Sequence, residues 1–234
     1  MSAAHDDRLD PPFDVRPGGM LRRAPGRETF LGRGPAGEPA VIKRYDGRAG
    51  LVERENLVAL ARAGLPVPAA LGARARGRSS LVAMAFVPHA QTLRDLAAEV
   101  APAERARRAG ELLDLVVALH GAGWYHRDLY LEHFLVRADD GRLVLIDVGR
   151  ARRRRRPRRR WLVKDLAALL HSTPPAVGPR ERLRFLARYL DARGVEGRRA
   201  RRRWLRAVVA KERRMAAHPP RFGRSFPLPA QEGA

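Results

Sequence analysis

Two aspartates separated by a strong turn signal constrain this chain most. Asp128 follows the pair His126-Arg127, and Asp147 lies nineteen residues later, directly after the apolar pair Leu145-Ile146. Between the two aspartates, two strand-like apolar runs flank Asp139-Asp140-Gly141, a sequence typical of a β-hairpin turn. Because a hairpin brings the chain back toward its starting point, we expect both carboxylates to reach one site.

Short apolar runs separated by glycine and proline residues predict the remaining secondary structure. The predicted strands outside the hairpin cover residues 20–24, 28–32, 40–45 and 79–87. One helix over residues 48–63 follows the third strand, because apolar residues recur there at helical spacing before Gly64 and Pro66. From residue 92 onward helical periodicity dominates. We therefore predict an α+β, two-lobed fold: a small N-terminal β-sheet lobe with one helix, and a larger, mainly helical C-terminal lobe.

The charge balance points to an anionic partner. Lys and Arg together number 47 against 25 acidic residues, which gives a formal net charge of +22. Such a field attracts polyanions, although a coding bias toward arginine would produce the same scatter of charge. We do not expect nucleic acid as the partner, because no groove-reading module and no interleaved aromatic residues accompany the arginines. Cysteine is absent, which excludes thiol catalysis and thiolate metal sites.

The carboxylates Asp128 and Asp147 suit phosphoryl transfer, which needs an acid to hold the incoming hydroxyl, a metal on the phosphates and positive charge around them. Lys43 ends the strand-like run Val41-Ile42 and supplies such a charge. A lysine in this role needs a carboxylate from the next helix to fix its ammonium. We expect Glu55 to be that partner, with Glu53 as the alternative.

These motifs, taken in order along the chain, resemble the catalytic loop and the metal-binding turn of the protein-kinase superfamily. Residues 126–134 read HRDLYLEHF and residues 160–172 read RWLVKDLAALLHS. Both segments resemble the lipopolysaccharide core kinase family, which includes heptose and Kdo kinases and InaA-like proteins. Tyr130 and His133 stand where protein kinases carry Lys and Asn, whereas the turn Asp147-Val148-Gly149 is closer to protein kinases than to the heptose enzymes.

The resemblance implies an ATP-dependent phosphotransferase with an alcohol group as acceptor and with Mg²⁺ as cofactor. Asp128 would orient the acceptor hydroxyl, Asp147 would hold Mg²⁺, and Lys43 would contact ATP. His133 is a second candidate metal ligand, or it hydrogen-bonds a phosphate or Asp147. Asp165 would accept backbone N–H groups and fix the catalytic loop.

The other nucleotide contacts are expected in the N-terminal lobe. Gly26 lies in the turn that would cover the phosphates, and Met84 and Phe86 occupy the expected adenine-binding segment. Residues 32–37 match the pattern GxGxxG, but too little chain separates them from Lys43 for a phosphate loop, so we expect a turn between two strands. The predicted boundaries are a flexible tail (1–19), a nucleotide-binding lobe (20–87), a catalytic lobe (88–218) and a second flexible tail (219–234).

The arginine run Arg150–Arg160 follows the metal-binding turn. In the resembled family the acceptor is an anionic glycolipid at the cytoplasmic face of the inner membrane, which this run would dock, whereas a solvated loop is the alternative. No export signal is visible, and no segment reaches the roughly 18 to 20 apolar residues of a spanning helix. We therefore expect a cytoplasmic protein with peripheral membrane contact. A kinase acting on a protein or small-molecule hydroxyl, and a non-catalytic pseudokinase that binds anions, remain alternatives.

Overall fold

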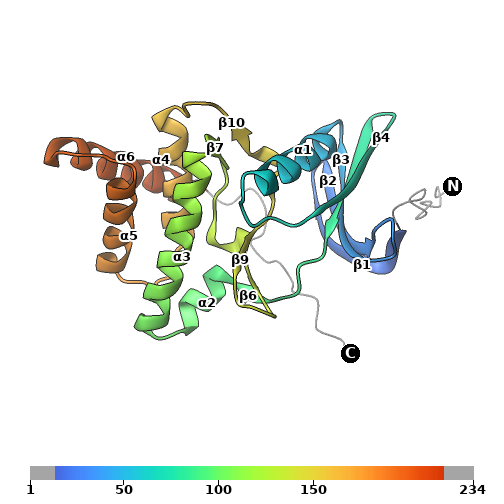
Figure 1. Ribbon diagram of the computed structural model, residues 1–234, viewed down its shortest axis with the longest axis horizontal. Helices are drawn as coiled ribbons and strands as arrows, with labels where there is room; N and C mark the ends of the chain where they lie inside the picture. Colours follow the sequence, from blue (N-terminus) through green and yellow to red (C-terminus); the bar gives the residue numbers. More distant parts are fainter. Residues whose placement is uncertain (1–13, 219–234) are drawn as a thin grey trace. The chain divides into compact units, whose positions relative to one another are not determined.

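The computed structural model describes residues 14–218, and the chain is traced in Figure 1. These residues divide into two compact units. Unit 1 comprises residues 14–59 and 68–86, and unit 2 comprises residues 60–67 and 87–218. The chain passes from the first unit into the second after Phe86.

Unit 1 is built on an antiparallel sheet with the strand order β1-β2-β3-β5-β4. The strands are β1 (Asp14–Ala24), β2 (Arg27–Arg33), β3 (Pro39–Asp46), β4 (Ala70–Arg76) and β5 (Ser79–Ala85). Gly26 turns the chain between β1 and β2 with a φ of 70°, a conformation that glycine adopts without steric cost. A small core forms where Ala40, Ile42 and Ala83 pack together with Leu71 and Leu81.

Helix α1 (Ala49–Arg62) follows β3 and approaches the sheet closely at its first turn. The backbone N–H of Gly50 donates to the hydroxyl of Ser80 on β5 at 3.0 Å, and a Cβ at Gly50 would lie 3.1 Å from the backbone carbon of Leu81. The absence of a side chain at Gly50 therefore lets the start of the helix rest directly on the strand, which fixes the positions of the residues that follow.

Unit 2 is mainly helical. Its elements in chain order are β6 (His89–Thr92), α2 (Leu93–Glu99), α3 (Pro102–Gly121), β7 (Trp124–Tyr125), η1 (Leu131–His133), β8 (Phe134–Arg137), β9 (Leu143–Leu145), η2 (Val148–Arg150), β10 (Arg152–Arg153), α4 (Arg159–Ser172), α5 (Pro179–Ala192) and α6 (Arg198–Ala216). The strands form two small sheets, β6-β8-β9 and β7-β10. Helix α4 packs against α6, and α3 packs against α5.

A buried polar chain joins three helices in the core of unit 2. Nδ1 of His120 on α3 lies 2.8 Å from the Tyr189 hydroxyl on α5, and Nε2 lies 3.3 Å from Oδ2 of Asp165 on α4. The carboxylate fixes the hydrogen on Nε2, so the tyrosine hydroxyl donates to Nδ1. Burial raises the pKa of Tyr189, which keeps its phenol protonated as a donor. The helices beneath the catalytic loop are thus held in one register.

The predicted α+β fold is confirmed, and the hairpin expected around residues 139–141 is present as β8 and β9. The predicted N-terminal tail is wrong for residues 14–19, which belong to β1. This part of the strand was not predicted because Pro17, Gly18 and Gly19 are residues typical of turns. The register of β1 against β2 shifts on either side of Met20. Residues 1–13 and the predicted C-terminal tail lie outside the described residues. Across residues 14–218, no helix combines the length and apolar character needed to cross a membrane.

Candidate active site

The catalytic loop predicted around Asp128 is held by its backbone. The N–H groups of His126 and Arg127 donate to the two oxygens of Asp165, each at 2.7 Å. Arg127 has a φ of 77°, which non-glycine residues rarely adopt. The expected role of Asp165 is confirmed, because its carboxylate compensates a backbone conformation that costs energy.

One face of α4 supports this loop along its length. Trp161, Lys164 and Asp165 follow the i, i+3, i+4 spacing that places side chains on one side of a helix. The Arg127 guanidinium lies 5.2 Å from the centre of the Trp161 ring, and the hydroxyl of Ser172 accepts the N–H of Leu131 at 2.9 Å. Polar or aromatic residues of the segment 160–172 that contact the loop include Trp161, Lys164, Asp165, Ser172 and His171, whose ring meets that of Tyr130.

The Asp128 carboxylate has a cation at each oxygen. Nζ of Lys164 lies 3.2 Å from Oδ1, and Nη1 of Arg150 lies 2.7 Å from Oδ2. The side chain of Asp128 is 20% exposed and that of Arg150 is 59% exposed. Asp128 is therefore ion-paired but open to a molecule that arrives from solvent, as a base for an acceptor hydroxyl has to be.

His126 is a scaffold residue. Its side chain is fully buried, and Nε2 lies 3.3 Å from the carbonyl of Ile146, one residue before Asp147. Burial lowers the pKa of His126, and the neighbouring His133 adds to this effect. The imidazole is therefore kept neutral and connects the catalytic loop to the turn that carries Asp147.

Asp147 and His133 come together, as the sequence predicts for a metal-binding pair. Nδ1 of His133 lies 2.8 Å from the backbone carbonyl of Asp128, which requires the hydrogen to be on Nδ1. In the neutral ring Nε2 then carries the lone pair, and this atom lies 3.8 Å from Oδ2 of Asp147. Asp147 itself has a φ of 57°, the second positive value among the described non-glycine residues.

This donor set fits a cation that also binds phosphates. Within residues 14–218 no group of three or more His, Cys, Asp or Glu side chains could enclose a metal alone. Mg²⁺ prefers oxygen and is usually held by one or two carboxylates together with substrate phosphates. Asp147 meets that requirement, and the Nε2 lone pair of His133 offers a second, less favoured ligand.

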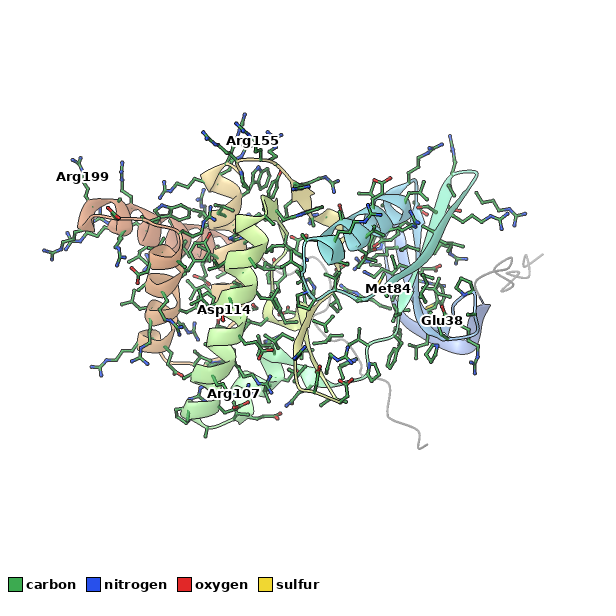
Figure 2. All side chains as sticks on the ribbon, viewed as in Figure 1. Glu38, Met84, Arg107, Asp114, Arg155 and Arg199 are labelled. Atoms are coloured by element: carbon green, nitrogen blue, oxygen red, sulfur yellow. The ribbon has the colours of Figure 1, made fainter. Side chains whose placement is uncertain are left out.

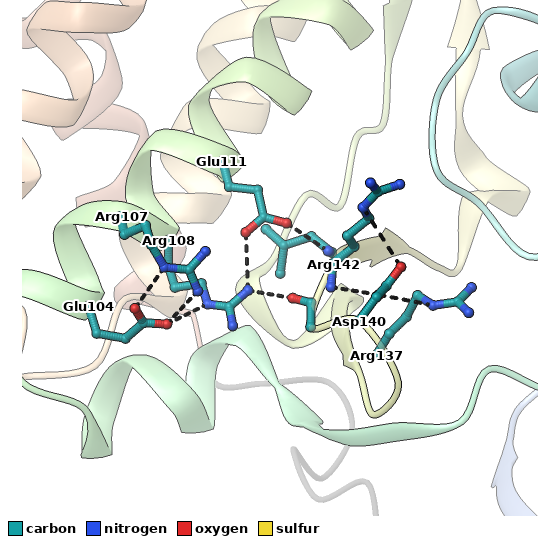
Figure 3. A network of polar contacts seen from close by, with 9 residues as sticks. Glu104, Arg107, Arg108, Glu111, Arg137, Asp140 and Arg142 are labelled. Atoms are coloured by element: carbon teal, nitrogen blue, oxygen red, sulfur yellow. Dashed lines mark hydrogen bonds and ion pairs between the residues drawn. The ribbon is translucent and has the colours of Figure 1, made fainter.

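The hairpin that leads to Asp147 is braced by α3 (Figure 3). A guanidinium N–H of Arg108 donates to the carbonyl of Gly141, and Oε1 of Glu111 accepts the N–H of Leu143 at 2.9 Å. Glu104 and Glu111 both pair with Arg108, at 2.9 and 3.1 Å. Further pairs within the hairpin, drawn in the same figure, join Asp140 to Arg137 and Arg142. These contacts fix the strand whose next turn carries Asp147.

Unit 1 contains a second ion pair at the position expected for the nucleotide lysine. Nζ of Lys43 on β3 lies 2.6 Å from Oε1 of Glu53 on α1, and Oε2 of the same glutamate accepts the Tyr45 hydroxyl at 2.5 Å. The predicted partner Glu55 is wrong, because its side chain is exposed on the opposite side of α1. Glu53 shares the buried face with Leu57 and Leu60, at i+4 and i+7.

The other predicted nucleotide residues stay predictions, although their surroundings are defined. Gly26 forms the β1–β2 turn, Met84 is buried in β5, and the N–H of Phe86 donates to the carbonyl of Pro39 at 3.0 Å. As expected, the chain turns between β2 and β3 here, over residues 34–38, and a bond from the Gly37 N–H to the Gly34 carbonyl at 3.0 Å closes the turn, whereas residues 32 and 33 still belong to β2.

The arginine run is ordered at both ends. Arg152 and Arg153 form β10, which pairs with Tyr125 and Trp124 just before the catalytic loop. Gly123 makes this pairing possible, because its φ is 84° and a Cβ there would lie 2.4 Å from the carbonyl oxygen of Arg154. At the other end the run enters α4 at Arg159. The run is therefore paired with β7 at one end and helical at the other, and its arginine side chains are exposed.

Two residues of this site escaped sequence reasoning. Lys164 lies in the segment 160–172, but its spacing along the chain does not indicate a contact with Asp128. In the sequence, Arg150 is one of many arginines in the run Arg150–Arg160. The only sequence signal for Lys164 is its position directly before Asp165, the residue that anchors the loop.

Comparisons with known proteins agree with this geometry. Residues 47–189 match the model of the "Lipopolysaccharide kinase (Kdo/WaaP) family". A curated relative, the lipopolysaccharide core heptose(I) kinase WaaP of Pseudomonas aeruginosa, is 42% identical over 97 residues, covering 38% of this chain and 36% of the relative. The chain thus matches about a third of that relative's length.

A solved structure extends the comparison to the fold. The crystal structure of an aminoglycoside-3'-phosphotransferase of type VIII superposes with a TM-score of 0.55 at 20% identity, covering 77% of this chain and 87% of that one. At this level of identity the similarity concerns the fold alone, and it supports a kinase-like fold for both units of the chain.

Proposed function

Because the chain belongs to the lipopolysaccharide kinase (Kdo/WaaP) family, we propose that it is an ATP-dependent kinase that phosphorylates a sugar hydroxyl of a lipopolysaccharide inner core or a related anionic glycolipid. The observation that carries this proposal is the Asp128 carboxylate. It is fixed on a strained loop, is partly exposed, and has cations at both oxygens. This is the arrangement that a base for phosphoryl transfer requires.

Asp128 orients the acceptor. A sugar hydroxyl donates its hydrogen to a carboxylate oxygen, and the carboxylate takes the proton as the oxygen bonds to the γ-phosphorus. Until then Lys164 and Arg150 each pair with one of the carboxylate oxygens of Asp128. Oδ2 becomes accessible when the exposed Arg150 side chain turns toward an anionic group of the acceptor.

Nucleotide binding is assigned to Lys43, Asp147 and His133. Lys43 is held at 2.6 Å by the buried Glu53, so its ammonium is fixed before ATP binds, and we assign it to the ATP phosphates. Asp147 holds the metal, and the Nε2 atom of His133 either ligates it or contacts a phosphate. Magnesium, when bound, bridges phosphate oxygens and offsets their charge. Gly26, Met84 and Phe86 are further proposed nucleotide contacts.

Acceptor docking is assigned to the arginine run Arg150–Arg160. Gly121 and Ala122 line a concave surface together with Arg153, Arg154 and Arg155. The side chain of Arg155 points outward in Figure 2, away from the helices of its own unit. Guanidinium groups bind phosphates and carboxylates through paired hydrogen bonds, so this surface suits a sugar head group rich in such anions. The same arginines would place the protein at an anionic membrane surface.

Labelled ATP and purified protein test the proposal. We expect Mg²⁺-dependent transfer of label to core glycolipid and much less to free neutral sugars or to protein. Transfer of the label to protein or to a small metabolite would show that the protein is a kinase with a different acceptor. Absence of both ATP binding and transfer would leave a non-catalytic anion-binding protein and overturn the proposal.

A further inference from the structure

Lysine is rare in this chain and concentrated at the proposed active site. Among 47 basic residues only three are lysines: Lys43, Lys164 and Lys211. Lys43 pairs with Glu53 and Lys164 pairs with Asp128, whereas Lys211 lies on α6. Two of the three lysines in this arginine-rich chain are therefore paired with carboxylates. Arginine would replace them if charge alone were needed, because its fork pairs with carboxylates better than an ammonium does.

Lys164 lies beside the carboxylate proposed as the base, Asp128. Its Nζ lies 3.2 Å from Oδ1 of Asp128, and its side chain is 21% exposed. Asp165, the next residue, binds the backbone of the loop that carries Asp128, so one turn of α4 fixes both partners. A carboxylate that takes the proton of the acceptor hydroxyl lies within hydrogen-bond reach of that hydroxyl. A cation in contact with the same carboxylate therefore lies next to the oxygen that attacks phosphorus.

Within the catalytic loop, the Arg127 guanidinium lies over the Trp161 ring, 5.2 Å from its centre. Tyr130, two residues after Asp128, is a neutral side chain whose ring lies 5.7 Å from the His133 ring, centre to centre. Phosphoryl transfer nevertheless needs positive charge on the transferred group. Within residues 14–218, Nζ of Lys164 donates to a single carboxylate oxygen, Oδ1 of Asp128, whereas an ammonium has three N–H donors.

We infer that Lys164 is a further catalytic residue, whose ammonium contacts the phosphoryl group as it passes from ATP to the acceptor held by Asp128. This inference rests on the proposed kinase function. In the step, the acceptor oxygen forms a bond to the γ-phosphorus, and the bond between that phosphorus and the β–γ bridging oxygen breaks, so ADP leaves with the electron pair. The hydroxyl proton moves to Asp128. Lys164 stays protonated and donates hydrogen bonds to oxygens of the transferred group.

Measurements of ligand affinity can distinguish a lysine that contacts the transferred phosphoryl group from one that only positions Asp128. The variants are Lys164→Ala and, as a matched control, Lys211→Ala. Titration calorimetry with Mg²⁺ would compare ADP alone with ADP plus aluminium fluoride, which mimics the transferred group. We expect Lys164→Ala to bind ADP like the wild type but to lose at least about tenfold in affinity for the aluminium fluoride complex, with kcat reduced about 100-fold. Lys211→Ala should match the wild type in all three measurements.

The outcomes are distinguishable. Equal discrimination between the two ligands by Lys164→Ala and the wild type would overturn the inference and leave the kinase intact. A wild type that binds no Mg²⁺–nucleotide would overturn the proposed function, and the inference with it. Lys164→Met keeps most of the side-chain stem and repeats the test if the alanine variant does not fold. If Lys164→Ala lowers kcat but binds ADP plus aluminium fluoride as tightly as the wild type does, Lys164 only positions Asp128, and the inference is wrong.

Discussion

Among residues 14–218, two lysine–carboxylate pairs differ in how exposed their side chains are. In unit 1, Lys43 and Glu53 lie 2.6 Å apart with side-chain exposures of 9% and 0%, and Tyr45 donates to the remaining glutamate oxygen. In unit 2, Lys164 and Asp128 lie 3.2 Å apart with exposures of 21% and 20%, and the second oxygen of Asp128 pairs with the solvent-exposed Arg150.

This difference in exposure suits different roles: the buried Lys43–Glu53 pair holds its lysine in a fixed position, whereas the carboxylate of the more exposed Lys164–Asp128 pair can react. A closed pair loses its stabilisation when either partner is removed, because an uncompensated buried charge is left behind. An open carboxylate can exchange partners, and a base must do so when its substrate arrives. We therefore expect substitutions in the first pair to affect folding stability most and substitutions around Asp128 to affect turnover most.

The largest effect is expected on turnover from Asp128→Asn. The amide keeps the size of the side chain but cannot accept the hydroxyl proton, so kcat should fall by about 10² to 10⁴, the range for loss of a general base. Steady-state assay with core glycolipid and calorimetry with Mg²⁺–ATP measure both properties. Unchanged turnover would show that Asp128 is not the base.

Glu53→Gln should lower the free energy of unfolding by about 3 kcal/mol, because the buried ion pair at 2.6 Å would lose its carboxylate charge. Glu55→Gln is the matched control on the exposed side of α1, with an expected change within about 0.5 kcal/mol. Urea denaturation measures both. Equal effects of the two variants would contradict the assignment of Glu53 as the partner.

Arg150→Gln should have a modest effect. Its ion pair is exposed, so stability should change by less than about 1 kcal/mol. We expect the KM for anionic glycolipid to rise several-fold, because Arg150 would no longer bind an acceptor anion. Arg199→Gln, an exposed arginine on α6, should leave KM unaltered. A KM that responds equally to both variants would indicate general charge attraction instead.

The smallest effect is expected in the alkaline range of the rate profile. Burial lowers the pKa of Lys164 below its ordinary value of 10.5 and Arg150 acts in the same direction, whereas Asp128 and Asp165 oppose the shift. A required ammonium is present below its pKa and is lost as the pH rises through it, so kcat should decline there. Lys164→Arg stays protonated, and its kcat–pH profile should lack that decline. An identical decline in the variant would assign it to another group.

Much of the fold could be predicted from the sequence because its signals are local. Asp139-Asp140-Gly141 marks a hairpin whatever surrounds it, and Asp128, Asp147 and Asp165 lie in segments whose order along the chain is informative. Strand β4 was missed because Ala70–Arg76 contains no β-branched or aromatic residue, although it forms a hairpin with β5 through the two residues 77–78.

The partners of charged residues were harder to predict, for two different reasons. The choice between Glu53 and Glu55 could have been made, since Leu57 and Leu60 define the buried face of α1 and Glu53 lies on it. The contact between Lys164 and Asp128 could not, because it joins residues 36 positions apart and depends on where α4 packs beneath the loop.

Mass spectrometry of the core glycolipid from source cells with and without this protein tests the central claim most directly. The account predicts that the glycolipid lacks one phosphoryl group without the protein, and that the wild-type protein restores it whereas Asp128→Asn does not. An identical glycolipid in both cells, or full restoration by Asp128→Asn, would contradict it.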